Sequence, residues 1–541
     1  MRLKKVMVGW LTGMALISAG CSQSSENSKG AAENKVVYAA PTELSTLDSS
    51  LVQDINAANY LGHLQEGLFW EDEKNEVHPS LAKELPEISK DGKLVKIKLR
   101  EDAKWANGDK ITAHDFVYAV QRLANPKTGA SYSYLLENFE NGPEILKGQK
   151  DYQTIGVKAL DDYTIEIRLN RPTPYINHLL AFVSFYPLNK KFVEEKGDQY
   201  GTSAENVLAS GPYQITEWDG SSNKWTLKKN PNFFAADKVK VETIEVQVMK
   251  EVSTNVNLFE AGKIDNAILT GETVKQFADH PKAVKREKAR LSYLEFNRKK
   301  DYLNNAKLRE AIDFAIDNKA LTQQIIGDGS VATSTFLPKK FYFNPDTQKD
   351  FVDEVAVPEK ADGNKAKELW EEAKKELGKD QLTIRLLADD DEKAKKECQY
   401  IQGQIQNHLP GVQVELVNVP KKNRLKQMKK QDFDLVLTEW GADYADASNF
   451  YDLYKTGNAY NSGDYSNAEY DAILAKAANE DALKPKERWE DFKKAQKILT
   501  DDHALVVLYQ AAETQLRNPR LKGMIFRPVN LEFDFRTAYF E

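Results

Sequence analysis

The sequence predicts an α/β protein built of two lobes and an inserted segment, and three observations support that fold class. Between residues 364 and 438, segments of helical periodicity alternate with segments of strand periodicity, which is typical of layered α/β structures. Residues 66–186 are richer in short strands and turns. The length of 541 residues indicates three or four domains, or fewer large ones, at roughly 150 residues per domain.

Three strands are predicted where apolar residues alternate with charged or polar ones with a period of two. They cover residues 95–99, 165–169 and 244–248. Three helices are predicted where apolar residues recur every three or four positions, over 308–316, 366–377 and 394–405. Strands over 382–387, 412–417 and 433–438 complete an order of helix, strand, helix, strand and strand from residue 364 onwards.

Single residues mark the ends of the last two predicted helices. Gly378 follows the helix over 366–377 and is expected to cap it. The acidic run 389–391 precedes the helix over 394–405, where carboxylates cap free N–H groups and favour the helix dipole. Cys398 lies on the apolar face of that helix, so we expect a buried, inert thiol.

Composition excludes several classes of protein. The chain has 75 basic and 82 acidic residues, a net charge of −7, which argues against a general nucleic-acid binder. Hydrophobic residues make up 41% of the chain, which is too many for a disordered protein. Only two cysteines are present, Cys21 and Cys398, so a disulfide-rich scaffold and a cysteine-built zinc site are excluded.

The N-terminus has the layout of a secretory signal peptide, predicted over residues 1–20. Basic residues come first, an apolar stretch follows, and the small residues 18–20 precede Cys21. This arrangement resembles a bacterial lipobox, which implies lipidation of Cys21, although Ser18 stands where leucine is usual. The alternative is a soluble secreted protein with a free thiol at Cys21.

Residues 21–35 are predicted to be a flexible tether, because they carry many small polar residues and no large apolar one. A lipid at the start of this tether would hold the protein on the extracellular face of the cell membrane. A lysine-rich body and a polar tether suit the surface of a Gram-positive cell.

Motifs for catalysis and for metal binding are missing from the sequence. It contains no His-Glu-x-x-His, no Gly-x-x-x-x-Gly-Lys, no Cys-x-x-Cys and no Gly-x-Ser-x-Gly, and its seven histidines are scattered. We therefore predict that the protein is not an enzyme and has neither a metal site nor a cofactor.

One long segment identifies a family. Residues 80–123 contain Lys104-Trp105, Asn107-Gly108-Asp109 and Thr112-Ala113-His114-Asp115-Phe116 in order. This segment closely resembles the signature region of the family 5 extracellular solute-binding proteins, which are the oligopeptide- and dipeptide-binding components of ABC importers. Further matching motifs follow in family order along essentially the whole mature chain, such as Ser210-Gly211-Pro212-Tyr213 and Trp440-Gly441-Ala442-Asp443-Tyr444.

The resemblance implies a periplasmic-binding-protein-like fold of the class C type, with two lobes and an extra inserted domain. Lobe I would be discontinuous (36–65, 187–290 and 511–541), the inserted domain would cover 66–186, and lobe II would cover 291–510. Expected partners are an oligopeptide ligand, the separate permease and ATPase subunits of the importer, and the membrane through the lipid anchor. Nucleic acid is not expected as a partner, and the protein is expected to be a monomer.

The resemblance also implies a ligand site. In oligopeptide-binding relatives, a Trp-x-Ala-Asp-Tyr stretch supplies the aspartate that pairs with the α-ammonium of the peptide, and here that aspartate is Asp443. Its position just past a predicted strand suits this role, because ligands in α/β lobes bind near strand ends. Without the resemblance, a surface-turn aspartate would be the simpler interpretation. Other residues expected to contact the peptide are Gln53, Asp54, Ile55, Tyr132, Leu437, Glu439, Trp440, Gly441 and Tyr444.

Two of these contacts are expected through the main chain. The segment 53–55 and the segment 437–441 should pair with the peptide backbone, which lets side chains of any kind be accepted. Tyr132 should flank the ligand. Some relatives hold the peptide carboxylate with arginines where this chain has Met428 and Leu437, so the C-terminus is expected to be held differently.

Alternatives remain open at this point. A dedicated receptor for a signalling peptide, such as a pheromone, would have the same fold, and Met428 and Leu437 would suit an apolar peptide. A nickel, haem or sugar binder is less favoured because Asp443 is retained. A hydrolase is the least favoured.

Overall fold

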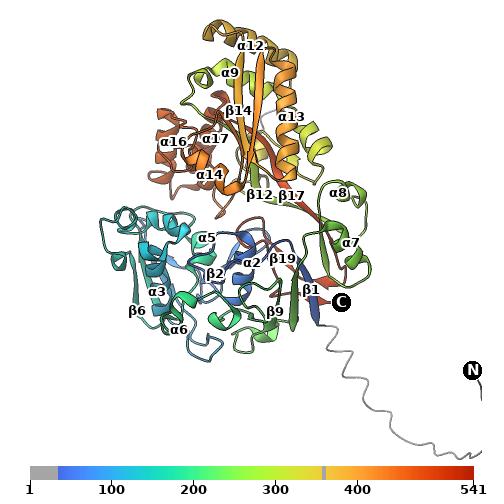
Figure 1. Cartoon of the computed structure of the whole chain (residues 1–541). Helices are drawn as coiled ribbons and strands as arrows, with labels where there is room; N and C mark the ends of the chain where they lie inside the picture. The colour runs from blue at the N-terminus through green and yellow to red at the C-terminus, as the bar shows by residue number, and fades with distance from the viewer. Residues whose placement is uncertain (1–33, 356–360) are drawn as a thin grey trace, which may run out of the picture.

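The computed structural model describes residues 34–355 and 361–541. It has the expected α/β fold with two lobes, one above the other in Figure 1. The predicted signal peptide, Cys21 and most of the predicted tether lie outside the described residues, and strand β1 (Lys35–Ala40) begins at the last residue of that tether. In the part of the chain that is described, no helix is long and apolar enough to cross a membrane.

The lower lobe is built on a four-stranded sheet in the order β1-β10-β9-β8. Strand β1 is parallel to β10 (Thr243–Val248), whereas β9 (Lys224–Lys229) is antiparallel to both β10 and β8 (Tyr213–Thr216). The strand predicted over 244–248 is therefore confirmed, with its apolar residues turned into the core. Helix α2 (Ile55–Leu64) packs on β8.

Residues 66–186 contribute an antiparallel sheet of their own, in the order β4-β5-β7-β6. Its strands are β4 (Glu87–Ile88), β5 (Leu94–Lys98), β6 (Val157–Asp161) and β7 (Thr164–Arg168). Helix α3 (Ala113–Ala124) follows a capping box made by Thr112 and Asp115. The apolar side chains of this segment and those of the lower lobe form one continuous cluster, so the segment has its own sheet but shares its core.

The upper lobe is organised around a larger sheet in the order β11-β17-β12-β16-β14-β15. Its strands are β11 (Asn266–Leu269), β12 (Ala283–Phe296), β14 (Leu382–Asp389), β15 (Val412–Val419), β16 (Leu435–Gly441) and β17 (Leu505–Arg517). The predicted helices are confirmed as α9 (Ala306–Ala315), α12 (Gly363–Leu377) and α13 (Glu392–His408), and they lie beside β14 in Figure 1. As expected, Gly378 ends α12 in the left-handed region and Asp391 caps α13.

The structure corrects the predicted element order in one place. Helix α14 (Lys421–Lys429) lies between β15 and β16, where the sequence predicts no helix. Its only buried side chains are Arg424 and Met428, so no apolar stripe of helical period marks it. Cys398, by contrast, is buried as expected, and burial raises the pKa of its thiol to about 12.

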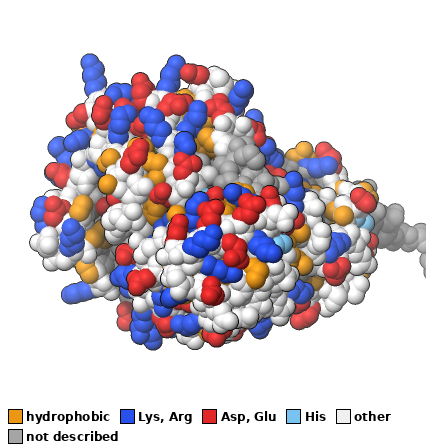
Figure 2. Space-filling view, turned by 90° about the horizontal axis from the view of Figure 1, so that it is seen from above, with side chains coloured by type: hydrophobic (Ala, Val, Ile, Leu, Met, Phe, Trp, Pro, Cys, Tyr) orange, Lys and Arg blue, Asp and Glu red, His pale blue; other side chains and the backbone are white. Residues whose placement is uncertain are grey.

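Charged side chains of both signs are interspersed on the face of the upper lobe shown in Figure 2. In the upper lobe, several lysines pair with acids one turn away on the same helix, as Lys374 does with Glu371 at 2.7 Å on α12. The described part of this face therefore lacks the basic stripe that nucleic-acid binding requires.

Two long strands connect the lobes. Strands β12 and β17 pair antiparallel from the lower lobe into the upper one (Figure 1). Their register shifts between Glu287 and Leu291, where residues 288–290 interrupt the regular ladder, and again between Ser292 and Tyr293. Such a bulge is a place where paired strands bend.

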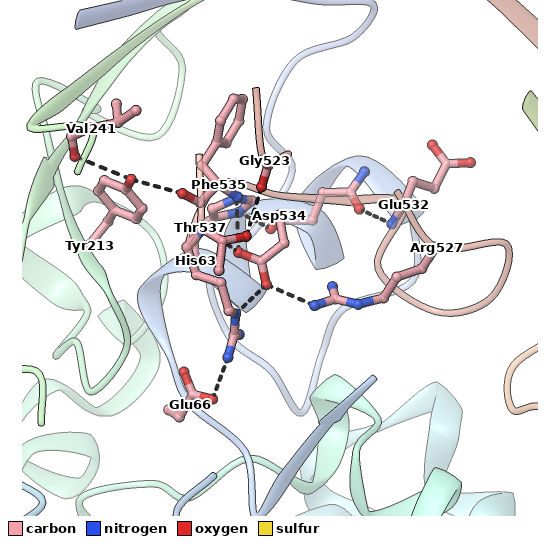
Figure 3. A network of polar contacts seen from close by, with 12 residues as sticks. His63, Glu66, Tyr213, Val241, Gly523, Arg527, Glu532, Asp534, Phe535 and Thr537 are labelled. Atoms are coloured by element: carbon pink, nitrogen blue, oxygen red, sulfur yellow. Dashed lines mark hydrogen bonds and ion pairs between the residues drawn. The ribbon is translucent and has the colours of Figure 1, made fainter. Parts of the chain in front are cut away.

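A buried charge network fixes the C-terminal segment to the lower lobe (Figure 3). Asp534 accepts hydrogen bonds from Arg527 Nη2 at 2.8 Å and from Arg536 Nε at 2.6 Å. Arg536 also pairs with Glu66 at 3.0 Å. Burial acts to raise the pKa of Asp534, but the two guanidinium groups outweigh it and hold that pKa well below its usual range. The network is therefore stable only while all its charges are present.

We expect Asp534→Ala to lower the free energy of unfolding by about 3–5 kcal/mol, because it leaves two buried guanidinium groups without their shared carboxylate. Urea denaturation followed by tryptophan fluorescence measures this. Asp501→Ala is the control: its exposed pair with Lys497 at 2.5 Å should contribute less than about 1 kcal/mol. Equal losses in the two variants would contradict the structural role of the network. Because the pKa of Asp534 is depressed on folding, its contribution should be lost as the pH falls below about 4.

Candidate functional site

Strand β16 has one paired edge and one edge that is open over its last five residues. Along its whole length, from Leu435 to Gly441, it pairs with β12. On its other side, β14 pairs only with Leu435 and Val436. Among the described residues, no strand pairs with the second edge from Leu437 to Gly441. Main-chain groups on such an edge are available to an added strand.

Asp443 lies two residues beyond the end of β16 and is held by neighbours from two parts of the chain. The hydroxyl of Tyr134 donates to its carboxylate. Its main-chain N–H donates to Oδ1 of Asn449 at 3.2 Å, and Nε1 of Trp440 donates to the same oxygen at 2.9 Å. Asn449 therefore sets the position of both Trp440 and Asp443.

The carboxylate of Asp443 is short of positive charge. Burial raises its pKa to about 6, against the lowering effect of the hydrogen bonds with Tyr134 and Asn449. No lysine, arginine or histidine of the described chain forms an ion pair with it. A ligand cation would supply that missing charge, since a buried carboxylate is stabilised mainly by an opposite charge within a few ångströms.

A cavity of about 400 Å³ opens beside Asp443. Its walls come from two separate parts of the chain, 134–179 in the segment next to the lower lobe and 440–460 in the upper lobe. Its size is within the range usual for small-molecule and peptide side-chain pockets. The site thus lies between the lobes, with the carboxylate on its wall.

The structure brings several predicted residues close to this carboxylate. Trp440 makes an edge contact with Tyr460, with ring centroids 4.9 Å apart, and Tyr444 stacks on Tyr175 at 4.4 Å. The pKa of Tyr132 is raised by burial and then by the negative charges of Asp443 and Asp54. Both carboxylates therefore lie within electrostatic range of the same phenol.

Glu439 and Gly441 face an arginine that sequence reasoning missed. Arg290 on β12 lies 3.5 Å from the carboxylate of Glu439. A Cβ at Gly441 would lie 3.2 Å from Nε of Arg290, so a larger residue there would require the guanidinium to shift slightly. The open edge of β16 thus carries the acidic side chain of Glu439, and the basic side chain of Arg290 lies beside it.

Segment 53–55 is placed on the lower lobe, and its three side chains are exposed. Asp54 caps α2, accepting a hydrogen bond from the N–H of Ala57 at 2.9 Å, and Ile55 is the first residue of that helix. Only Gln53 precedes the cap. Main-chain pairing of this segment with a ligand stays a prediction. Because α2 begins at Ile55, only Gln53 and Asp54 are in extended chain that could pair in this way.

Leu437 and Met428 are buried in the upper lobe, with 6% and 8% of their surfaces exposed. Their side chains belong to apolar clusters behind the sheet. The idea that these two side chains offer an apolar surface to a ligand is therefore wrong. Leu437 can reach a ligand only through its main chain.

Tyr134, Asn449 and Arg290 are among the residues at this site that the sequence analysis did not find. Tyr134 is only two positions after Tyr132, so the short tyrosine repeat was the available signal. Asn449 and Arg290 reach the site through tertiary packing, and no motif marks them.

The class of protein follows from comparison with known families. The profile of the middle region of the bacterial extracellular solute-binding proteins, family 5, matches residues 76–462, and the chain belongs to this family. Its members bind substrates for uptake, so the chain is a solute-binding protein and not an enzyme.

Individual relatives span almost the whole chain. A dipeptide-binding protein of Lactococcus lactis is 32% identical over 544 residues, covering 98% of this chain and 97% of that protein. The peptide-bound OppA of Listeria monocytogenes is 36% identical with a TM-score of 0.80, covering 94% of this chain and 99% of that one. The pheromone receptor PrgZ is 34% identical with a TM-score of 0.81, covering 94% and 100%.

The pKa of about 6 for Asp443 predicts a pH-dependent affinity for ligand cations. Only the ionised carboxylate attracts a cation, so lowering the pH from 7 to 5 should weaken binding of a peptide with a free N-terminus roughly tenfold. Isothermal titration calorimetry at both pH values measures this. Asp443→Asn should bind weakly at both, whereas the exposed control Asp237→Asn should behave as wild type. A pH dependence that survives in Asp443→Asn would contradict the assignment.

Proposed function

We propose that this chain is the peptide-binding receptor of an ABC importer, which takes extended oligopeptides between its two lobes and delivers them to a separate permease and ATPase. The relatives named for dipeptide and oligopeptide binding support this proposal, since their alignments cover nearly all of the chain. The single observation that carries it is Asp443, a partly buried carboxylate just beyond the end of an open strand edge, with no cation partner among the described residues.

The two features of the site match the two constant features of a peptide. Asp443 would pair with the α-ammonium, and the edge from Leu437 to Gly441 would pair with the main chain. A strand advances about 3.3 Å per residue, so an edge of this length accommodates roughly four or five peptide residues. The remaining predicted contacts, Gln53, Asp54, Ile55 and Tyr132, would complete the site from the lower lobe.

We further propose that the lobes close by bending at the interruption in the β12–β17 ladder. The register shift lies between Glu287 and Leu291, next to the boundaries proposed for lobe I (36–65, 187–290, 511–541) and lobe II (291–510). Closure would bury the ligand, and its greater affinity for the closed form would shift the population toward that form.

A dedicated receptor for a signalling peptide is the second candidate, and the likeness to the pheromone receptor PrgZ favours it. Met428 and Leu437 do not favour this candidate, because both side chains are buried. Competition with a random peptide mixture separates the two functions: a dedicated receptor keeps its cognate peptide, whereas a nutrient receptor exchanges it.

The proposed localisation is the extracellular face of a Gram-positive cell membrane, with a lipid on Cys21. We expect Cys21→Ala to move the protein from the membrane fraction to the culture medium or cell wall wash, because the polar tether alone has no affinity for lipid. Fractionation and metabolic labelling with a palmitate analogue measure this. Retention of the variant in washed membranes would contradict the anchor.

The function itself is tested by the ligands that the protein retains. Mass spectrometry of molecules released from the denatured protein should find peptides with free N-termini. Peptides with an acetylated N-terminus should bind at least tenfold more weakly than their free counterparts, a difference of about 1.4 kcal/mol or more. Recovery of sugars, haem or metal instead of peptides, or equal affinity for acetylated peptides, would overturn the proposal.

A further inference from the structure

Helix α14 (Lys421–Lys429) and the residue that follows it carry exposed charge of one sign only. The exposed charged residues of this stretch are Lys421, Lys422, Lys426, Lys429 and Lys430. Residues 420–431 contain no acidic residue, although the whole chain has a net charge of −7. On the face of the upper lobe in Figure 2, by contrast, both signs are interspersed. The five lysines are therefore a local exception to the charge distribution of the protein.

The five lysines lie on the side of α14 that is turned away from the sheet. At 3.6 residues per turn, positions 421, 425 and 429 form one row along the helix, and positions 422, 426 and 430 form the next row. Arg424 lies on the packed side, where it pairs with Asp389 at 2.7 Å and donates to Oγ1 of Thr438 at 2.8 Å. Met428 packs against the sheet on the same side. The lysines, called the lysine face below, thus face solvent and not the open edge of β16.

The lysine face destabilises the helix that carries it. Lys426 is four residues from both Lys422 and Lys430, and like charges at this spacing repel one another. Lys421 and Lys422 are in the first turn, where the helix dipole favours acidic residues, and that turn has none. Among the described residues, no ion pair involves any of the five lysines. Charges that cost stability without a partner inside the chain point to a partner outside it.

The composition of the lysine face favours a membrane over a protein as that partner. Lysine is depleted in protein–protein interfaces, where the planar fork of arginine is preferred, and the one arginine of α14 is buried. Clusters of roughly four to eight basic residues beside a membrane are typical of sites for anionic lipid headgroups. Leu425, in the first row, is 50% exposed, and its apolar side chain would be accommodated in the headgroup layer.

The position of α14 also suits contact with a membrane. Strands β14, β15 and β16 are parallel, so their carboxyl ends share one edge of the sheet, and α14 begins just after β15 at that edge. Figure 1 places α14 at the end of the upper lobe that faces the lower lobe. The predicted tether, residues 21–35, spans at most roughly 50 Å when fully extended. It would hold the protein where the lysine face meets the membrane surface.

We propose that the lysine face is a docking surface for the anionic lipid headgroups of the membrane, and that it is a second membrane contact besides the lipid on Cys21. The inference rests on the proposed localisation, but it goes beyond peptide binding. Docking would keep the edge of the upper lobe that carries Asp443 close to the membrane. Each lysine near an anionic surface strengthens adsorption roughly fivefold at low salt. Without the lipid this adsorption is reversible, so the release of Cys21→Ala on washing is still expected.

The test measures binding of the unlipidated protein to vesicles. Residues 21–541 with Cys21→Ala are sedimented with vesicles of phosphatidylcholine that contain about 30% phosphatidylglycerol, or with vesicles of phosphatidylcholine alone. Partitioning at about 0.1 M salt should be at least tenfold stronger onto the anionic vesicles, and at about 0.5 M salt this advantage should disappear because salt screens the lysines. Equal partitioning onto the two kinds of vesicle would overturn the inference and leave an acidic protein surface as the partner. Since no peptide is present, the result is independent of the proposed peptide binding.

Two variants of equal net charge show whether the lysine face is responsible. The first replaces Lys421, Lys422, Lys426, Lys429 and Lys430 by glutamine, whose helix propensity is close to that of lysine. The control replaces five exposed lysines elsewhere, which are Lys104, Lys147, Lys158, Lys224 and Lys263. Partitioning onto anionic vesicles should fall at least tenfold in the first variant and less than threefold in the control. Equal losses would show a general charge effect and overturn the assignment to α14.

A fluorescent label locates the contact without removing any charge. With Cys21→Ala the remaining cysteine, Cys398, is buried, so Leu425→Cys offers one accessible thiol for an environment-sensitive dye. Its emission should shift to the blue on anionic vesicles, whereas a dye at Leu160→Cys, also 50% exposed, should not respond. Equal responses at both positions, or none at Leu425→Cys, would overturn the inference.

Peptide affinity separates docking from ligand binding. Because the lysine face is turned away from the open edge of β16, the five-glutamine variant should bind a peptide retained by the wild-type protein with unchanged affinity in isothermal titration calorimetry. A loss of tenfold or more would show that the lysines belong to the peptide site and would overturn the inference.

Discussion

The pairing of β12 with β17 is the constraint on which the rest of the structure depends. The chain enters the upper lobe along β12 and leaves it along β17. The segment from residue 297 to residue 504 is therefore joined to the rest of the chain through these two paired strands. At the break in their register, two basic and two acidic side chains form a cluster with contacts of 2.9–3.1 Å: Arg286, Lys288, Glu513 and Glu532. These ion pairs hold the ladder together beside the break, which supports the proposal that the lobes bend at the break itself.

The position of the candidate site follows from this arrangement. Strand β16 is the neighbour of β12 on the side away from β17, and its C-terminal end emerges toward the gap between the lobes. The chain after Gly441 turns into a loop that Asn449 holds in place, which fixes Asp443 at the end of an open strand edge. The carboxylate is desolvated by both lobes at once, and its pKa is raised for that reason. In the proposed function, closure of the lobes and recognition of the ligand charge would therefore occur together.

Local sequence patterns were sufficient for much of the fold. Helices α12 and α13 and strands β14 and β15 follow from periodicity, because each has one face in the core. Helix α14 could not be found in this way: its buried residues are one arginine and one methionine, and the arginine is there to pair with Asp389 at 2.7 Å. The motif around Asp443 marked the candidate carboxylate, and the tyrosine repeat beside Tyr132 was the only local signal for Tyr134, whereas no local pattern marks Arg290.

The sequence by itself determined the family and the α/β class, because the family motifs and the helix and strand periodicities each lie in contiguous runs of residues. Contiguous runs also carry two predictions, the secretory N-terminus and the role of Asp443 as the carboxylate for an ammonium group. The tertiary structure alone decided which side chains face the ligand. Leu437 and Glu439 have the same parity on one strand, yet Leu437 is buried and Glu439 lies 3.5 Å from Arg290, beyond the point where pairing of β16 with β14 ends at Val436. The cavity past Asp443 likewise exists only where two distant segments meet, and no single segment encodes its volume.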